Sequence, residues 1–126
     1  MREVCFLISH AGAILHADAS DDPVALPDTR SRWEAIWAHR DELAIIAHSH
    51  PVGPARFSRE DQTTMEALDS ALGRPVRYMV VAPRITIVCD GHAGETTQVS
   101  PEPWWAGLLR LASNMKVRKA DTQWHS

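Results

Sequence analysis

Residues 43–61 read Leu-Ala-Ile-Ile-Ala-His-Ser-His-Pro-Val-Gly-Pro-Ala-Arg-Phe-Ser-Arg-Glu-Asp and combine three structural signals in a short stretch. The first five residues are apolar, which predicts a buried central strand at 43–47. Two prolines and a glycine then predict a loop over 51–57. A long helical pattern follows over 58–72, and we expect it to end at Gly73, which suits a left-handed C-terminal cap. The segment therefore predicts a strand, a loop and a helix in succession.

The remainder of the chain predicts further strands and helices around this unit. Short apolar runs indicate strands, and apolar residues at helical spacing indicate two more helices, one of them with Trp33, Ile36 and Trp37 on one face. We expect strands at 4–8, 13–16, 76–81 and 85–89, helices at 31–40 and 102–115, and a loop at 18–30 that holds a short strand at 24–26. This order predicts an α/β sandwich in which helices cover a mixed sheet.

Length and composition indicate one soluble globular domain. A chain of 126 residues has room for a single core. Its 44% apolar and 23% charged residues are ordinary for such a domain. We expect the domain over residues 1–115 and a polar tail over 116–126, where the basic residues Lys116, Arg118 and Lys119 are solvated.

The charge and the cysteine content indicate which classes of partner and which cellular compartment to expect. A net charge of −3 gives no reason to expect a nucleic-acid partner, because such domains usually carry a basic face. The sequence offers no signal peptide and no run of about 20 apolar residues, so we expect no membrane partner. Cys5 and Cys89 lie in strand-like runs, which indicates buried free thiols rather than a disulfide framework. We therefore expect a cytoplasmic protein.

His48 and His50 stand two positions apart at the end of the predicted central strand. Side chains at i and i+2 of a strand point to the same face, so the two imidazoles emerge together. Asp61 lies in the first turn of the next helix, where the helix dipole favours a carboxylate. Two nitrogens and one oxygen suit zinc and leave a fourth position for water. We therefore expect one Zn²⁺ per chain, which would lower the pKa of its bound water to about 7.

Each part of this pattern also has a simpler interpretation. Ser58-x-x-Asp61 is a good helix start in its own right, with Ser58 as N-cap. A lone His48 is more often a strand-end histidine than a ligand. His-x-His also occurs in unrelated hydrolases of the amidohydrolase type, but these need a longer barrel with further histidines. The combination favours a metal site, and capping by Ser58 is compatible with ligation by Asp61.

The spacing His-x-His, seven residues, Ser-x-x-Asp resembles the signature of the JAMM (MPN+) metalloproteases, a family with JAB domains that includes ubiquitin isopeptidases and small archaeal and bacterial relatives. The match from His48 to Asp61 has no gap, and a looser resemblance extends from Glu3 to about Val88. The resemblance implies a single MPN/JAB-like domain of the cytidine-deaminase-like type, with a curved mixed sheet flanked by helices.

The resemblance also implies a catalytic glutamate upstream, on the first strand. Three glutamates that precede the motif come into question, namely Glu3, Glu34 and Glu42. Glu3 opens the first apolar run, where the family places this residue. Glu34 lies in a predicted helix, and Glu42 stands too early in its strand to reach the metal. Glu3 is therefore the expected general base, and Ser58 is implied to donate a hydrogen bond to the oxyanion.

The implied function is zinc-dependent hydrolysis of a peptide or isopeptide bond. The family relation suggests the C-terminus of a ubiquitin-like or sulfur-carrier protein as one substrate. The alternative is a non-catalytic MPN-like scaffold that binds partner proteins. Such members typically lack some metal ligands, whereas this sequence carries all three. The tryptophan-rich segment near the C-terminus either closes the core as a terminal helix or serves a partner, such as a second copy of the chain.

Overall fold

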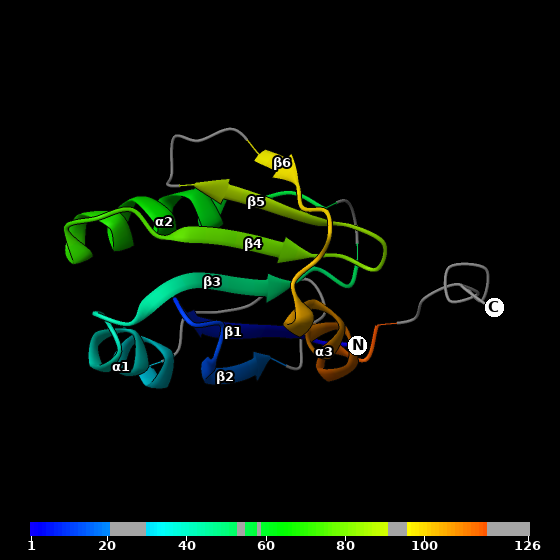
Figure 1. Ribbon diagram of the computed structural model, residues 1–126, viewed down its shortest axis with the longest axis horizontal. Coiled ribbons are helices and arrows are strands. Elements are labelled where there is room, and N and C mark those ends of the chain that lie inside the picture. Colours follow the sequence, from blue (N-terminus) through cyan, green and yellow to red (C-terminus); the bar gives the residue numbers. More distant parts are fainter. Residues whose placement is uncertain (21–29, 53–54, 58, 91–95, 116–126) are drawn as a thin grey trace.

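A six-stranded mixed sheet forms the centre of the computed structural model, which describes residues 1–20, 30–52, 55–57, 59–90 and 96–115. The strands are β1 (Glu3–Ser9), β2 (Ile14–Ser20), β3 (Leu43–Ser49), β4 (Arg77–Val81), β5 (Thr86–Asp90) and β6 (Thr96–Gln98). Their order across the sheet is β2-β1-β3-β4-β5-β6 (Figure 1). β3 and β4 are parallel, and the other described neighbours are antiparallel. A parallel pair needs a crossover, which contains helix α2 (Arg59–Leu72).

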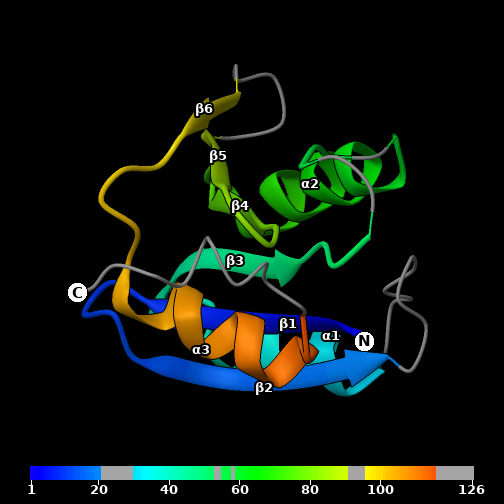
Figure 2. The same cartoon turned by 90° about the vertical axis from the view of Figure 1, so that its right-hand side faces the viewer.

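Helices cover both faces of this sheet. Helix α1 (Arg30–Ala38) and α2 lie on one face, and α3 (Trp104–Ser113) lies on the other (Figure 2). Each face buries its own apolar cluster because successive strand residues point to opposite sides. The α1–α2 face buries Leu7, Ile36, Ile46, Met65, Leu68 and Tyr78, among others. The α3 face buries Phe6, Ile8, Ala47, Met79, Trp105 and Leu109, among others.

The antiparallel pairing of β1 and β3 brings the start of one strand to the end of the other. Cys5 lies opposite His48, and Leu7 lies opposite Ile46. The chain then leaves β3 and enters α2. The residues before Cys5, the residues around His48 and the first turn of α2 are therefore neighbours, although they are distant in the sequence.

The structure confirms the predicted α/β class and most of its elements, with three corrections. Residues 18–20 belong to β2 rather than to a loop, because Asp18 and its neighbours pair with β1. The short strand β6 was not predicted, since its three residues are polar and exposed. The inward side of α1 is formed by Arg32 and Ile36, whereas the predicted indole face is largely exposed.

Other sequence predictions concern residues outside the described part of the chain. These are the short strand at 24–26, Ser58 and the tail at 116–126. Cys5 and Cys89 are both buried free thiols, as expected. Among the helices that the structure describes, none has the length and apolar character needed to cross a membrane.

Candidate metal centre

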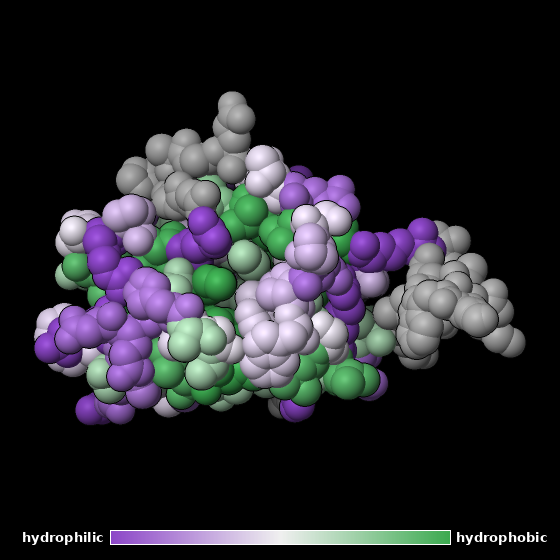
Figure 3. Space-filling view, viewed as in Figure 1, coloured by the Kyte–Doolittle hydropathy of each residue, from purple (hydrophilic) through white to green (hydrophobic). Residues whose placement is uncertain are grey.

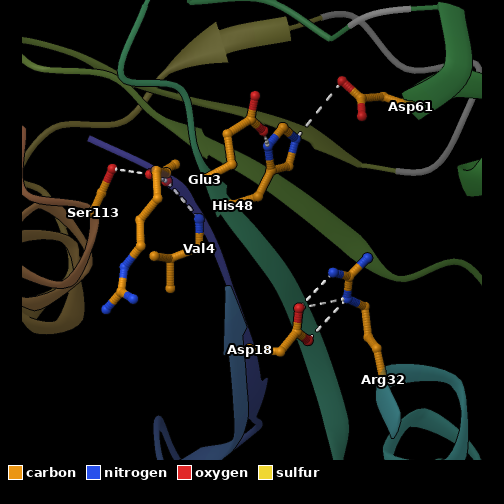
Figure 4. A network of polar contacts seen from close by, with 9 residues as sticks. Glu3, Val4, Asp18, Arg32, His48, Asp61 and Ser113 are labelled. Carbon is orange, nitrogen blue, oxygen red and sulfur yellow. Dashed lines mark hydrogen bonds and ion pairs between the residues drawn. The ribbon is translucent and has the colours of Figure 1, made fainter. Parts of the chain in front are cut away.

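Glu3, His48 and Asp61 meet at the end of the sheet where β1 begins and β3 ends (Figure 4). Glu3 is two residues from Cys5, which pairs with His48, so the side chains of Glu3 and His48 point to the same face. Asp61 approaches from the first turn of α2. Three separate elements thus bring their polar side chains to one place.

The imidazole of His48 lies between the two carboxylates. Its Nδ1 atom is 3.6 Å from Oε1 of Glu3, and its Nε2 atom is 3.7 Å from Oδ2 of Asp61. The side chain of Glu3 is only 4% exposed and that of His48 13%, whereas that of Asp61 is 29% exposed. The cluster is therefore closed on the Glu3 side and open to solvent on the Asp61 side.

Positive charge is favoured at His48. Burial lowers the pKa of His48, but the nearby carboxylates of Glu3 and Asp61 outweigh burial and raise it above the ordinary value of 6.5. Nδ1 is buried and has no hydrogen-bond partner among the described residues. The ring of Phe57 lies edge-on, with 6.3 Å between ring centroids. An imidazole in this setting favours a proton or a metal ion.

His50 follows β3 and continues its extended path. Its backbone N–H donates a hydrogen bond of 2.8 Å to the carbonyl of Val81, which extends the β3–β4 pairing by one residue. The His50 ring is nearly perpendicular to the His48 ring, and their centroids are 6.2 Å apart. The two imidazoles are neighbours, as the i, i+2 spacing predicted.

A tetrahedral zinc ion sets the spacing of the atoms that bind it. Metal–ligand distances of about 2.0–2.2 Å place two ligand atoms about 3.3–3.6 Å apart. The 3.7 Å between His48 Nε2 and Asp61 Oδ2 is close to this range. Two imidazoles on one zinc have centroids roughly 5 Å apart, so His50 would have to move closer to His48. Accordingly, within the described residues no group of three such side chains is already assembled for a metal. The donor types fit zinc, but the described positions of these side chains do not yet form a three-ligand site.

Cys5 brings a thiol close to the cluster, because it lies opposite His48 in the β1–β3 pairing. Burial raises the pKa of its thiol to about 12. A thiol binds a metal as the thiolate, and this raised pKa disfavours the thiolate at neutral pH in the metal-free protein. The candidate ligands are therefore the nitrogens and the oxygen.

An ion pair between Asp18 and Arg32 borders the cluster on the same face of the sheet. Asp18 lies opposite Cys5, and the Arg32 guanidinium donates through Nε to Asp18 Oδ2 at 2.9 Å and through Nη2 to Oδ1. Arg32 is only 7% exposed. Sequence analysis missed this pair because Asp18 was assigned to a loop, and no local pattern joins a strand residue to a helix residue 14 positions later.

The three glutamates considered from the sequence have different surroundings. Glu34 pairs with Arg30, and Glu42 lies 3.5 Å from His39, both on exposed parts of the chain. Glu3 is the one of the three that lies beside His48. Ser58 is outside the described residues, so its predicted role stays a prediction.

Comparison with known proteins places this geometry within a protein family. A family model described as prokaryotic homologs of the JAB domain matches residues 3–101, which include Glu3, His48, His50 and Asp61. Helix α3 lies beyond the matched residues. Among curated proteins, none matches the chain.

Proposed function

The chain belongs to the family of prokaryotic JAB-domain homologs, and on this premise we propose that it is a zinc-dependent peptidase or isopeptidase. One observation carries the proposal beyond the family. The His48 imidazole is held between two carboxylates from two other elements, one buried and one partly exposed. Charged groups in such an arrangement are typical of functional sites, because burying them costs free energy that packing alone does not return.

His48, His50 and Asp61 are the residues that would hold zinc in this proposal. Zinc bound by three protein ligands supplies a nucleophile at neutral pH and polarises a carbonyl group. Asp61 is the most exposed member of the charged cluster, with a side chain 29% exposed. Substrate therefore approaches from the side of α2.

Glu3 acts as the general base and general acid in the proposed reaction. Its carboxylate lies beside His48 and is shielded from solvent. A carboxylate in this position can take a proton from the attacking water and deliver it to the leaving amine. Ser58 would donate a hydrogen bond to the developing oxyanion, which is worth about 3 kcal/mol in comparable sites. If its hydroxyl is committed to capping α2, alanine at this position should lower stability more than rate.

The substrate class follows from the family relation and not from a particular contact. Hydrolysis of peptide and isopeptide bonds is therefore the reaction to assay first. The C-terminus of a ubiquitin-like or sulfur-carrier protein is the first macromolecular substrate that we propose.

The proposal is tested by measuring the metal content of the purified protein by mass spectrometry. We expect about one zinc per chain in the wild type, a strong loss of zinc in His48→Ala, and retained zinc with abolished turnover in Glu3→Gln. Glu34→Gln is the matched control, because it neutralises an exposed glutamate of α1. A wild-type protein that binds no zinc even when zinc is added would refute the metal centre. Normal turnover in Glu3→Gln would refute the role of Glu3.

A non-catalytic scaffold is the second candidate, and two observations favour it. The His48–His50 spacing is wider than a bound zinc requires. The face that carries α3 exposes large apolar side chains, including Trp104 at 65% and Leu111 at 78%. Hydrophobic (green) patches are visible beside α3 in Figure 3. If zinc is absent, a partner protein on this face becomes the leading hypothesis.

A further inference from the structure

Side-chain hydroxyls hold the first residues of β1, where its backbone pairing with β3 has ended. The described pairs of the β1–β3 ladder run from Ser9 opposite Leu43 to Cys5 opposite His48. One residue before Cys5, the N–H of Val4 donates to Oγ of Ser49 at 2.8 Å. Ser49 is fully buried on the α3 face. The pairing of β1 with β3 is thus continued by a serine side chain.

Arg2, the residue before β1, is held by the last residue of α3. Its N–H donates to the carbonyl of Ser113 at 3.0 Å, and its carbonyl accepts a hydrogen bond from Oγ of Ser113. Ser49 Oγ also donates to this carbonyl, at 3.4 Å. The Arg2 side chain donates from Nε to the carbonyl of Ala112 at 3.0 Å. Ser113 is fully buried, whereas the bond from the Arg2 side chain to Ala112 is exposed to solvent.

These contacts bracket Glu3 in the sequence. Residues 2 and 4 are fixed on the α3 side of β1, whereas the Glu3 side chain points to the opposite face and reaches within 3.6 Å of His48. Glu3 also pairs with Ser20 of β2 at the strand's other edge. Fixing the backbone on both sides of a residue limits the directions in which its side chain can point.

We propose that Ser113 and Ser49 are positioning residues that hold the Glu3 carboxylate beside His48, so that α3 controls the site from the opposite face of the sheet. The catalytic meaning of this placement rests on the proposed function, but the placement itself does not. Helix α3 lies outside the residues that match the family model, so the contact through Ser113 joins the matched residues to a helix beyond them.

The primary test is NMR of the ring nitrogens of His48 in metal-free protein at one fixed pH. Glu3→Gln provides the reference, because it removes the carboxylate charge next to Nδ1. The Ser49→Ala/Ser113→Ala double variant should move the His48 resonances most of the way towards that reference. Each single variant should move them part of the way, which keeps the test valid if the double variant does not fold. Ser49→Thr restores a hydroxyl and should return the resonances towards the wild-type values.

Ser9→Ala is the matched control at the other end of β1. Its hydroxyl accepts a hydrogen bond of 3.0 Å from the N–H of Ala13, the same type of bond that Ser49 accepts from Val4. This variant should leave the His48 resonances unchanged. Equal shifts in Ser9→Ala would overturn the proposal. So would a lower melting temperature in the Ser49 and Ser113 variants with unchanged His48 resonances, because the hydroxyls would then only stabilise the fold.

Kinetics distinguish this proposal from the proposed function. If the protein hydrolyses a substrate, Ser113→Ala should lower kcat by about tenfold to a hundredfold with little change in KM, as expected for a misplaced catalytic group. A protein with no zinc and no turnover would refute the proposed function, and the NMR shifts would still decide the positioning role. Unchanged kcat together with unchanged His48 resonances would refute the positioning role alone.

Discussion

Two buried charged side chains on the α1–α2 face of the sheet, Arg32 and Glu3, are neutralised to different degrees. Arg32 donates at least two hydrogen bonds to Asp18. Glu3 is equally buried, but its charged neighbour is a histidine at 3.6 Å, beyond hydrogen-bonding distance. A buried carboxylate held at that distance is costly unless a proton or a cation joins it. The contrast separates a structural ion pair from the site at which we propose the chemistry.

Arg32→Ala should strongly destabilise the protein because it leaves the Asp18 carboxylate buried without its partner. We expect the free energy of unfolding to fall by about 3–5 kcal/mol, the usual cost of breaking a buried ion pair from one side. Arg30→Ala is the control, since its ion pair with Glu34 is exposed and should change stability by less than about 1 kcal/mol. Chemical denaturation of both variants measures the difference. Equal losses of unfolding free energy in the two variants would show that burial does not determine how much each ion pair stabilises the protein.

At the scale of the helices, replacing two glycines by alanine should change the stability of the protein in opposite directions. Gly73 follows α2 with a φ of +72°, and an added Cβ would meet no atom within 4 Å. Gly73→Ala should therefore cost about 1 kcal/mol through backbone strain alone. Gly107 lies inside α3 in open space with no positive φ, so Gly107→Ala should stabilise by about 0.5–1 kcal/mol. Thermal unfolding of the two variants should shift in opposite directions, and a shared direction would contradict this account.

Elements with a clear apolar pattern could be predicted from the sequence, and those without one could not. The run Leu43–Ser49 and the helix that ends before Gly73 carry their signals locally. β6 has three polar, exposed residues, so no apolar alternation indicates it, and only its pairing with β5 makes it a strand. The inward side of α1 was also not predictable. Arg32 is buried there because Asp18 of another element receives it.

At the scale of the whole molecule, some residues of the candidate site could be predicted from the sequence and others could not. His48, His50 and Asp61 follow one another within a short segment, so their spacing in the sequence was enough to predict them as one site. Glu3 was identified by resemblance, and its place beside His48 depends on the register of β1 against β3. Ser113 lies 111 positions from Arg2, and no sequence pattern predicts their contact. It exists only because Trp105 and Leu109 dock α3 on the sheet.

One ion pair links α3 to the β4–β5 part of the sheet, and it makes the docking of the helix sensitive to acid. Glu102 accepts hydrogen bonds from Arg110 at 2.7 and 2.6 Å and from the Thr86 hydroxyl, and Arg110 also donates to the Ala82 carbonyl at 2.9 Å. These bonds, chiefly those from Arg110, hold the pKa of Glu102 below its ordinary value of 4.5. A carboxyl group with a lowered pKa stabilises the folded state above its unfolded pKa, and that contribution disappears as the pH falls through the folded pKa.

Glu102→Gln should therefore cost about 0.5–1 kcal/mol at pH 7, the range of a partly exposed ion pair. The difference in unfolding free energy between wild type and variant should shrink once the pH drops below 4.5, because the wild-type carboxyl then becomes neutral as well. Denaturant unfolding across this pH range measures the difference. A gap that stays constant into strong acid would mean that Glu102 acts through its shape and not through its charge. Because α3 also holds Arg2, amide hydrogen exchange at Arg2 should accelerate in the variant at neutral pH and be less affected in acid.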